Sequence, residues 1–295
     1  MNRAVLLTAF LAFLFTSFSG CDIINPEQKE PAYLEIDTFS FDNNGYGMPI
    51  QRITDAWVYV NSKYIGTYEL PAKRIPIIPN EDGSAATVWI DAGVYVDGIR
   101  TQRVAYPFYS RSTHSVQFIK GQTAKLTPSY KFTPTKVLVE DGFEGVTGFA
   151  IKKGKESTVP LEFVANTDNY PENGEQYAIM RAAKDSVETL QMLQTDSTVI
   201  PSYKPTYLEM SYKCSMPIGV GIYVQSTSTH QYIYGLTLNA TANQWKRVYV
   251  YLGDEMYPES YSHETGSLFQ FVILGKSDGA QEHFIAVDNL RLVQM

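Results

Sequence analysis

The sequence predicts an all-β protein built from two β-sandwich domains, and three observations lead to this prediction. Tyr is strongly overused, with 21 copies against 3 Trp, and Tyr, Thr, Val and Ile favour strands over helices. Short alternating runs separated by Gly, Pro and Asn recur along the chain, which is typical of strands joined by turns. About 275 residues follow the first 20, too many for one typical sandwich and comfortable for two domains.

The first 21 residues have the anatomy of an export signal. Arg3 supplies a positive start, residues 4–18 form an apolar stretch too short for a convincing membrane span, and Ser19-Gly20-Cys21 follows. This ending resembles bacterial lipoprotein signals, although Phe18 stands where Leu is usual. The resemblance implies that residues 1–20 are removed and that acylated Cys21 anchors the chain in a lipid bilayer. The alternative is a plain secretory peptide with an incidental cysteine.

A tether follows the signal. Residues 21–32 contain Pro26, Pro31 and several charged side chains without an apolar period, which predicts a segment that holds the first domain away from the membrane. Its acidic character resembles the export signals of surface lipoproteins of Bacteroidota. The resemblance implies an outer-membrane lipoprotein that is exposed at the cell surface.

Charge and cysteine content exclude some functions. The net charge is -7, and removal of Arg3 with the signal leaves 23 basic against 31 acidic side chains. Nucleic-acid binding needs clustered Lys and Arg, so we expect no nucleic-acid partner. Once Cys21 carries lipid, Cys214 has no disulfide partner in the chain, and the alternating run around it favours a small strand residue over a reactive thiol.

Residues 33–133 predict the first domain. In the run from Ile53 to Val60, alternate residues are apolar, and Asn61-Ser62-Lys63 turns the chain into a second strand from Tyr64 to Tyr68. The hairpin "WVYVNSKYIGTYELP" resembles small extracellular modules with a similar hairpin. The resemblance implies an immunoglobulin-like β-sandwich.

Residues 134–295 predict the second domain, and its ends carry a resemblance. An opening strand ends in "DGFE", a closing strand contains "VDNLRL", and Trp245 leads "WKRVYVYL". These features resemble the jelly-roll domains of carbohydrate-binding modules, which implies non-catalytic glycan binding. Five further strands are expected between the ends, at residues 207–213, 219–225, 232–238, 245–252 and 268–274.

The same resemblance implies a structural calcium ion. In such jelly rolls, acidic side chains of the first and last strands often share Ca²⁺ with backbone carbonyls, and the matching residues are Glu144 and Asp288. Calcium accepts six to eight hard oxygen ligands of this type. The alternative is that both acids cap strand ends and bind only the backbone.

Side-chain alternation indicates a ligand face, because residues two apart share one side of a sheet. If Val248, Val250 and Leu252 face the core, Arg247, Tyr249 and Tyr251 point outward. The same reasoning on the neighbouring runs leaves three more outward residues: Glu209, Tyr223 and Gln225. If these faces coincide, one sheet offers rings to stack on sugars and planar polar groups to bind hydroxyls. The alternative is an ordinary half-exposed sheet face stabilised by cross-strand Tyr pairs.

The loop at residues 253–266 predicts a second contact surface, with Tyr257 and Tyr261 as its aromatic residues. Loops held by a rigid scaffold often bind ligands. The alternative is that this polar loop is simply solvated.

We expect no enzymatic activity. The four histidines show no metal-ligand spacing, and no nucleophile, zinc or phosphate-loop motif occurs. The leading hypothesis is glycan binding by the second domain. The alternative is a protein-partner role, as an accessory subunit of an envelope complex or as an adhesin, because both functions use exposed aromatic residues with Arg.

Overall fold

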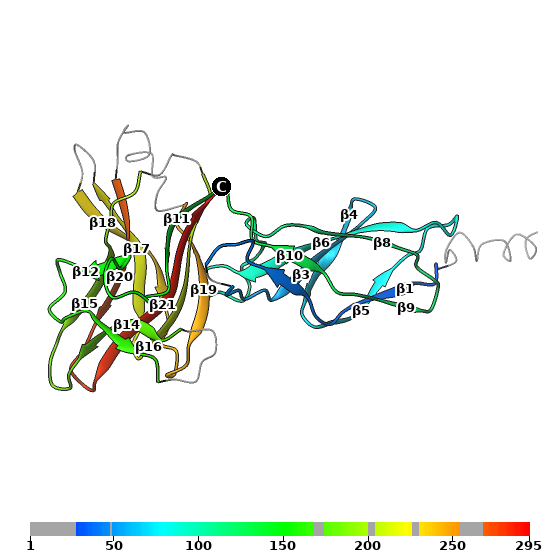
Figure 1. Ribbon diagram of the computed structural model, residues 1–295. Helices are drawn as coiled ribbons and strands as arrows, with labels where there is room; N and C mark the ends of the chain where they lie inside the picture. The colour runs from blue at the N-terminus through cyan, green and yellow to red at the C-terminus, as the bar shows by residue number, and fades with distance from the viewer. Residues whose placement is uncertain (1–27, 48, 168–173, 200–203, 226–229, 254–267) are drawn as a thin grey trace, which may run out of the picture.

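The computed structural model describes residues 28–47, 49–167, 174–199, 204–225, 230–253 and 268–295. Within these ranges the elements with assigned bounds are 21 strands (Figure 1), so the all-β prediction is confirmed. No helix in the described ranges is long and apolar enough to cross a membrane. The segments with the signal and Cys21, and the loop with Tyr257 and Tyr261, lie outside the described residues.

The N-terminal part contains β1 to β10 and has two layers. One layer is a five-stranded sheet with the order β4 (Lys63–Glu69), β3 (Asp55–Val60), β6 (Ala86–Tyr95) and β7 (Arg103–Ala105), in which β8 (Ser112–Val116) also pairs with β6. The other layer has a sheet of β5 (Ala72–Ile77), β1 (Ala32–Ile36) and β9 (Thr123–Leu126), and a pair of β10 (Ser129–Lys131) and β2 (Ser40–Asp42). Alternate residues of both layers fill one hydrophobic core.

The predicted hairpin of this part is confirmed. Strands β3 and β4 pair antiparallel up to Val60 and Lys63, which leaves two turn residues. Asn61 and Ser62 have φ values of 48° and 65°, as two-residue hairpin turns require. Whether the whole part has an immunoglobulin-like topology stays a prediction.

The C-terminal part contains β11 to β21 and consists of two packed sheets. The first, here the joint sheet, has the order β13 (Glu162–Ala165), β14 (Gln176–Ala182), β21 (His283–Gln294), β16 (Thr206–Cys214) and β19 (Lys246–Tyr251), and β11 (Lys136–Asp141) also pairs with β21. The second, here the outer sheet, has the order β12 (Ile151–Lys153), β15 (Thr189–Gln194), β20 (Leu268–Lys276), β17 (Ile218–Gln225) and β18 (His230–Leu238). The predicted pairing of the opening and closing strands is present as β11 with β21.

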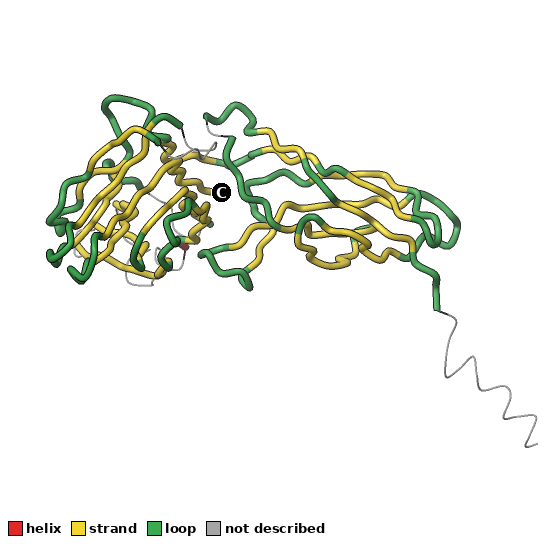
Figure 2. The backbone as a smooth tube through the Cα atoms, turned by 90° about the horizontal axis from the view of Figure 1, so that it is seen from below, coloured by secondary structure: helices red, strands yellow, loops and turns green. Residues whose placement is uncertain are grey.

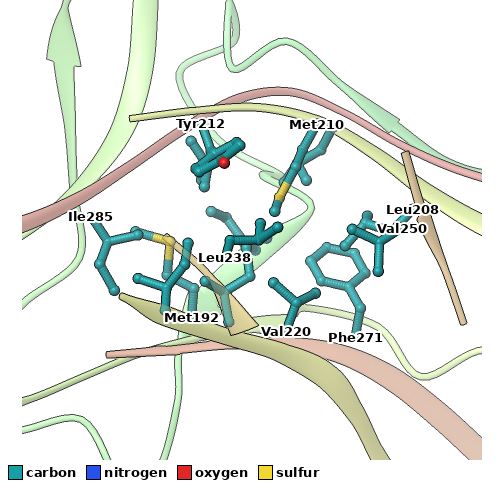
Figure 3. Close-up of a cluster of buried hydrophobic side chains, with 14 of the residues drawn as sticks. Met192, Leu208, Met210, Tyr212, Val220, Leu238, Val250, Phe271 and Ile285 are labelled. Carbon is teal, nitrogen blue, oxygen red and sulfur yellow. The ribbon is translucent and has the colours of Figure 1, made fainter. Parts of the chain in front are cut away.

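Residues from both sheets form the C-terminal core. Leu208, Met210 and Val250 of the joint sheet meet Val220 and Phe271 of the outer sheet (Figure 3). All five are almost fully buried. The alternation rule therefore assigned the core side of β16, β17 and β19 correctly.

The two parts meet end to end, with β19 beside the N-terminal part (Figures 1 and 2). Tyr207, Tyr249 and Val293 of the joint sheet belong to the hydrophobic cluster that forms the N-terminal core. Val96 makes a parallel bridge with Tyr249, and the Asp97 amide donates a hydrogen bond of 2.8 Å to the Tyr249 carbonyl. We call this contact the joint.

Candidate functional site

The predicted ligand residues do not share one surface. Glu209 lies on β16, and Arg247, Tyr249 and Tyr251 lie on β19, so they belong to the joint sheet. Tyr223 and Gln225 lie on β17 in the outer sheet. The two groups point away from the shared core on opposite sides of the C-terminal part, so the expectation that the faces coincide is wrong.

The group on the joint sheet is covered by the N-terminal part. Glu209 and Tyr249 are 0% and 1% exposed, and the Arg247 side chain is 1% exposed. The prediction that they form an open ligand surface is therefore wrong, because they are interior residues of the joint. Tyr251 is half-buried there, with its ring centroid 5.1 Å from that of Tyr207.

Glu209 is the centre of a buried ionic network in the joint. One carboxylate oxygen accepts a hydrogen bond of 2.7 Å from the Tyr106 hydroxyl of the N-terminal part. The other oxygen accepts a hydrogen bond of 2.8 Å from Arg247 and lies 3.5 Å from a guanidinium nitrogen of Arg291. Arg291 in turn pairs with Glu140 at 2.6 Å. A buried carboxylate is tolerated because each oxygen has such partners.

A group of tyrosines completes the joint. The Tyr249 hydroxyl accepts a hydrogen bond of 2.7 Å from the Arg52 amide and lies 3.0 Å from the Tyr109 hydroxyl. The Tyr106 ring centroid is 4.8 Å from that of Tyr249. Burial, together with the nearby Glu209 charge, raises the pKa of Tyr106 well above its ordinary value. The tyrosine therefore stays protonated and remains a donor to the carboxylate.

The outer sheet presents a different arrangement, a row of three tyrosines that we call the tyrosine face. Tyr223 on β17 pairs with Tyr232 on β18, and their ring centroids are 4.5 Å apart. The Tyr232 and Tyr234 rings are stacked at 6.2 Å with an interplanar angle of 16°. Tyr234 is 37% exposed, and the other two are partly exposed. The row therefore gives solvent a continuous aromatic surface.

A glycine makes room for this row. Gly221 on β17 lies opposite Tyr234, and a Cβ atom added to it would be 1.9 Å from the Ile233 carbonyl oxygen. No side chain fits there unless β18 moves. The close approach of the two strands thus depends on glycine at this position.

Amide side chains lie beside the tyrosine face. Gln225 donates a hydrogen bond of 3.1 Å to the side-chain carbonyl of Gln270 on β20. The side-chain nitrogen of Gln191 on β15 donates a hydrogen bond of 3.3 Å to the Tyr234 hydroxyl. The side-chain carbonyl oxygen of Gln191 accepts a hydrogen bond of 3.0 Å from the Glu156 amide. Burial raises the pKa of Tyr234, so its hydroxyl remains a donor. Rings with neighbouring amides and hydroxyls can bind both the C–H faces and the hydroxyls of a sugar.

The sequence analysis assigned Tyr223 and Gln225 to a ligand face, which stays a prediction, and did not include Tyr232 and Tyr234. Their signal was two tyrosines two residues apart in a strand. A bulge hid it: Val220 pairs with Leu236, but Gly221 pairs with Tyr234, so the strand changes face between the tyrosines and Leu236. Simple alternation would have put all of them on one side of the sheet.

Of the two predicted metal residues, Asp288 has a feature that fits a cation, whereas Glu144 is exposed and binds a backbone amide. Asp288 is fully buried, one carboxylate oxygen accepts a hydrogen bond of 2.7 Å from the Asn289 amide, and the other has no hydrogen-bond partner. Burial, with a smaller contribution from the Glu144 charge, raises the pKa of Asp288 to about 8. Glu144 itself accepts the Glu175 amide at 2.9 Å. In the described ranges no three His, Cys, Asp or Glu residues form a metal cluster, so backbone oxygens would have to complete the ligand set.

Cys214 is buried in the C-terminal core. Burial raises the pKa of its thiol to about 11. The thiol is therefore protonated at neutral pH and a poor nucleophile, because the thiolate is the reactive form.

No protein-family model matches the sequence, and no curated protein matches it. Similar solved structures are carbohydrate-binding modules. One is from work on the promiscuous specificity of such modules from the β-sandwich superfamily; it has 13% identity and a TM-score of 0.43, and the match covers 91% of this chain and 100% of that chain.

Two others match 54% of this chain and 94% of their own. The CBM22-1 xylan-binding domain of Xyn10C from Paenibacillus barcinonensis has 16% identity and a TM-score of 0.35. The family 11 module of the cellulosomal cellulase Lic26A-Cel5E of Clostridium thermocellum has 14% identity and a TM-score of 0.37. At these values the likeness does not assign a ligand to this chain.

Proposed function

We propose that the chain is a non-catalytic glycan-binding protein and that the tyrosine face of the outer sheet is its binding site. The observation that carries this proposal is the row of Tyr223, Tyr232 and Tyr234, with centroids 4.5 and 6.2 Å apart. Partly exposed rings in a row across two neighbouring strands match a ligand that repeats flat apolar faces. A sugar chain is such a ligand.

The polar neighbours of the row supply the other half of sugar recognition. Gln225 offers an amide at the surface, and the Tyr234 hydroxyl adds another donor. Gln191 is fully buried and orients the Tyr234 hydroxyl from below. Each aromatic contact contributes about 0.5–1.5 kcal/mol beyond its buried area. Three rings, one amide and one hydroxyl can therefore hold a short glycan without catalytic groups.

We further propose that acylated Cys21 anchors the protein in the outer membrane, facing the cell surface. The support is the Ser19-Gly20-Cys21 ending and the acidic tether. The described chain starts at the end of the N-terminal part that is far from the C-terminal part (Figures 1 and 2). In this arrangement the N-terminal part holds the tyrosine face away from the anchor.

A calcium ion is also proposed, held by Asp288 and Glu144 with backbone oxygens. The support is the buried Asp288 oxygen without a hydrogen-bond partner. Such an ion would neutralise both carboxylates and fasten the start of the C-terminal part to its last strand. It has no part in glycan contact, because the tyrosine face lies on the other sheet.

The test is retention of the chain from residue 22 onward on immobilised polysaccharides, measured by affinity electrophoresis against a broad panel. The double substitution Tyr232→Ala with Tyr234→Ala should weaken retention about tenfold or more, since it removes two aromatic contacts. Tyr234→Phe keeps the ring and should lose less. Tyr33→Ala, on β1 of the N-terminal part, is the control.

The following results would support or overturn the proposed glycan site, provided that the variants keep the wild-type melting temperature. Retention that the double substitution weakens about tenfold or more supports the proposal. Retention that it leaves unchanged, or no retention on any glycan, overturns it. Capture of a specific envelope protein that the double substitution releases would favour the protein-partner function instead.

A further inference from the structure

A second aromatic surface lies on the five-stranded sheet of the N-terminal part. Trp57 and Tyr59 of β3 and Trp89 of β6 point away from the core of that part. Tyr59 pairs with Trp89 on one side and with Tyr64 of β4 on the other. We call these four residues the N-terminal aromatic face. They include two of the three tryptophans of the chain.

Three of the rings are in contact, and Trp89 lies beside them through its strand pairing with Tyr59. The Tyr64 ring centroid is 5.8 Å from that of Trp57 and 5.3 Å from that of Tyr59. Tyr64 is 48% exposed, and the other three are partly exposed. The joint uses other residues of this part, such as Tyr106 and Tyr109, so the C-terminal part does not cover the N-terminal aromatic face.

The Trp57 indole lies against the sheet, over Gly93 of β6. A Cβ atom added to Gly93 of β6 would lie 2.8 Å from the Trp57 ring nitrogen, so the indole occupies the space that a side chain there would need. On the tyrosine face, a Cβ atom added to Gly219 of β17 would lie 3.4 Å from the Tyr234 ring, which is ordinary contact.

The charges beside these rings are already neutralised within the protein. Arg111 donates two hydrogen bonds of 2.7 Å to the two carboxylate oxygens of Asp91. Its guanidinium lies 4.9 Å from the Trp89 ring centroid and 5.3 Å from that of Tyr59. A strongly charged partner would have to break this bidentate pair to gain a charge contact here. The complement of this surface is therefore a neutral ligand.

The neighbouring polar groups select further among neutral ligands. Exposed hydroxyls of Thr87, Thr113 and Ser115 lie on the same side of β6 and β8, beside Trp89. Hydroxyls and the remaining acceptor capacity of Asp91 suit a ligand that carries many hydroxyl groups of its own. Flat rings suit its C–H faces. A neutral sugar chain has both properties.

We propose that the N-terminal aromatic face is a second glycan-binding site, which takes a neutral sugar chain across Trp57, Tyr59, Tyr64 and Trp89. It is independent of the site on the outer sheet. If one polysaccharide reaches both sites, the second contact is intramolecular and increases retention beyond that of either site alone.

Tryptophan fluorescence reports on this site directly. Trp57 and Trp89 lie in it, whereas Trp245 is buried beside Tyr177 in the C-terminal part and the tyrosine face contains no tryptophan. The probes are neutral xylo-, cello- and mixed-linkage gluco-oligosaccharides, with oligogalacturonate as the anionic comparison. The protein with Tyr232→Ala and Tyr234→Ala serves as the host, so that the other site is disabled.

We expect a saturable change in emission with a neutral probe in the wild type and in this host. Tyr59→Ala with Tyr64→Ala should weaken the interaction about tenfold, and Tyr64→Ala alone about threefold, because one or two ring contacts are lost. Tyr64 is half-exposed, so its single substitution should leave folding intact and keep the test valid.

Several results would overturn the inference. These are constant emission with every neutral probe, a response to the anionic probe alone, or a dimer in sedimentation that Tyr64→Ala dissociates. The last would show that a second copy occupies the face. Glycan retention that depends on Tyr232 and Tyr234 while emission stays constant would leave the tyrosine-face proposal standing and remove only this one.

Discussion

Substitution of Glu209 by glutamine removes the charge at the centre of the joint while it keeps the size of the side chain. In the native protein Arg247 and Arg291 are each 1% exposed and share this carboxylate at 2.8 and 3.5 Å. Arg291 retains Glu140 at 2.6 Å, but Arg247 loses its ionic partner. Breaking a buried ion pair from one side costs about 3–5 kcal/mol, and we expect a loss of about 3 kcal/mol in the free energy of unfolding.

The assay is equilibrium unfolding in urea, followed by fluorescence and circular dichroism. Glu162→Gln is the matched control, because its pair with Arg181 has a similar distance of 2.9 Å but both side chains are about half exposed. An exposed pair contributes about 0–1 kcal/mol. The contrast between the two glutamines therefore isolates the effect of burial.

Tyr106→Phe tests the part of this network that crosses the joint. It removes the hydroxyl that donates to Glu209 at 2.7 Å, and a hydrogen bond to a charged group contributes about 1.5–3 kcal/mol. If Glu209→Gln costs less than about 1 kcal/mol, as the exposed control should, the account of the joint as a desolvated ionic centre is refuted. A separate early transition in either variant would show that the two parts have become uncoupled.

Three further predictions follow from single sites. In the calcium-free protein, the pKa of folded Asp288 is about 8, above its ordinary value of 3.8. The protonated Asp288 therefore contributes its full stabilisation below about pH 4. The free energy of unfolding then falls by about 1.4 kcal/mol per pH unit as the pH rises toward 8. Asp288→Asn should flatten that slope in urea unfolding, and calcium should raise the melting temperature of the wild type but not of this variant. Gly221→Ala should destabilise the protein by about 1–3 kcal/mol or more and weaken glycan retention by the tyrosine face, because its Cβ would meet the Ile233 carbonyl oxygen; retention at the wild-type level would contradict this. Tyr249→Phe should cost about 1–3 kcal/mol in thermal unfolding, since the Arg52 amide and the buried Tyr109 hydroxyl each lose a hydrogen-bond partner, and an unchanged melting temperature would disprove it.

The sequence predicted the core sides of the strands well, because alternation is a property of the strand itself. Val248 and Val250 are buried in the C-terminal core, and Arg247 and Tyr249 point the other way. What alternation cannot reveal is what lies beyond the second side of the sheet. Here it is another part of the same chain, joined to β19 by long-range contacts that leave no local pattern.

The missed half of the tyrosine face has a different physical cause. Tyr232, Tyr234 and Leu236 have the same spacing, but the register shift opposite Val220 and Gly221 turns Leu236 toward the core. A bulge depends on the pairing of two strands, so neither strand shows it alone. The glycine at position 221 was visible in the sequence, and a glycine inside a strand is a sign of a bulge or a close approach.

The joint and the tyrosine face use the same residue types, and the state of their polar groups separates the two roles. In the joint, Glu209 has partners in both parts, the Tyr249 hydroxyl has two partners in the N-terminal part, and backbone groups of Asp97 and Tyr249 also bond across it. Such a contact fixes the orientation of the two parts. On the tyrosine face the rings contact one another and leave partly exposed surfaces. Because the joint buries its rings and pairs the Glu209 charge internally, the aromatic surfaces that remain for a ligand are those at a distance from it, and a rigid joint presents both of them in a constant relative orientation.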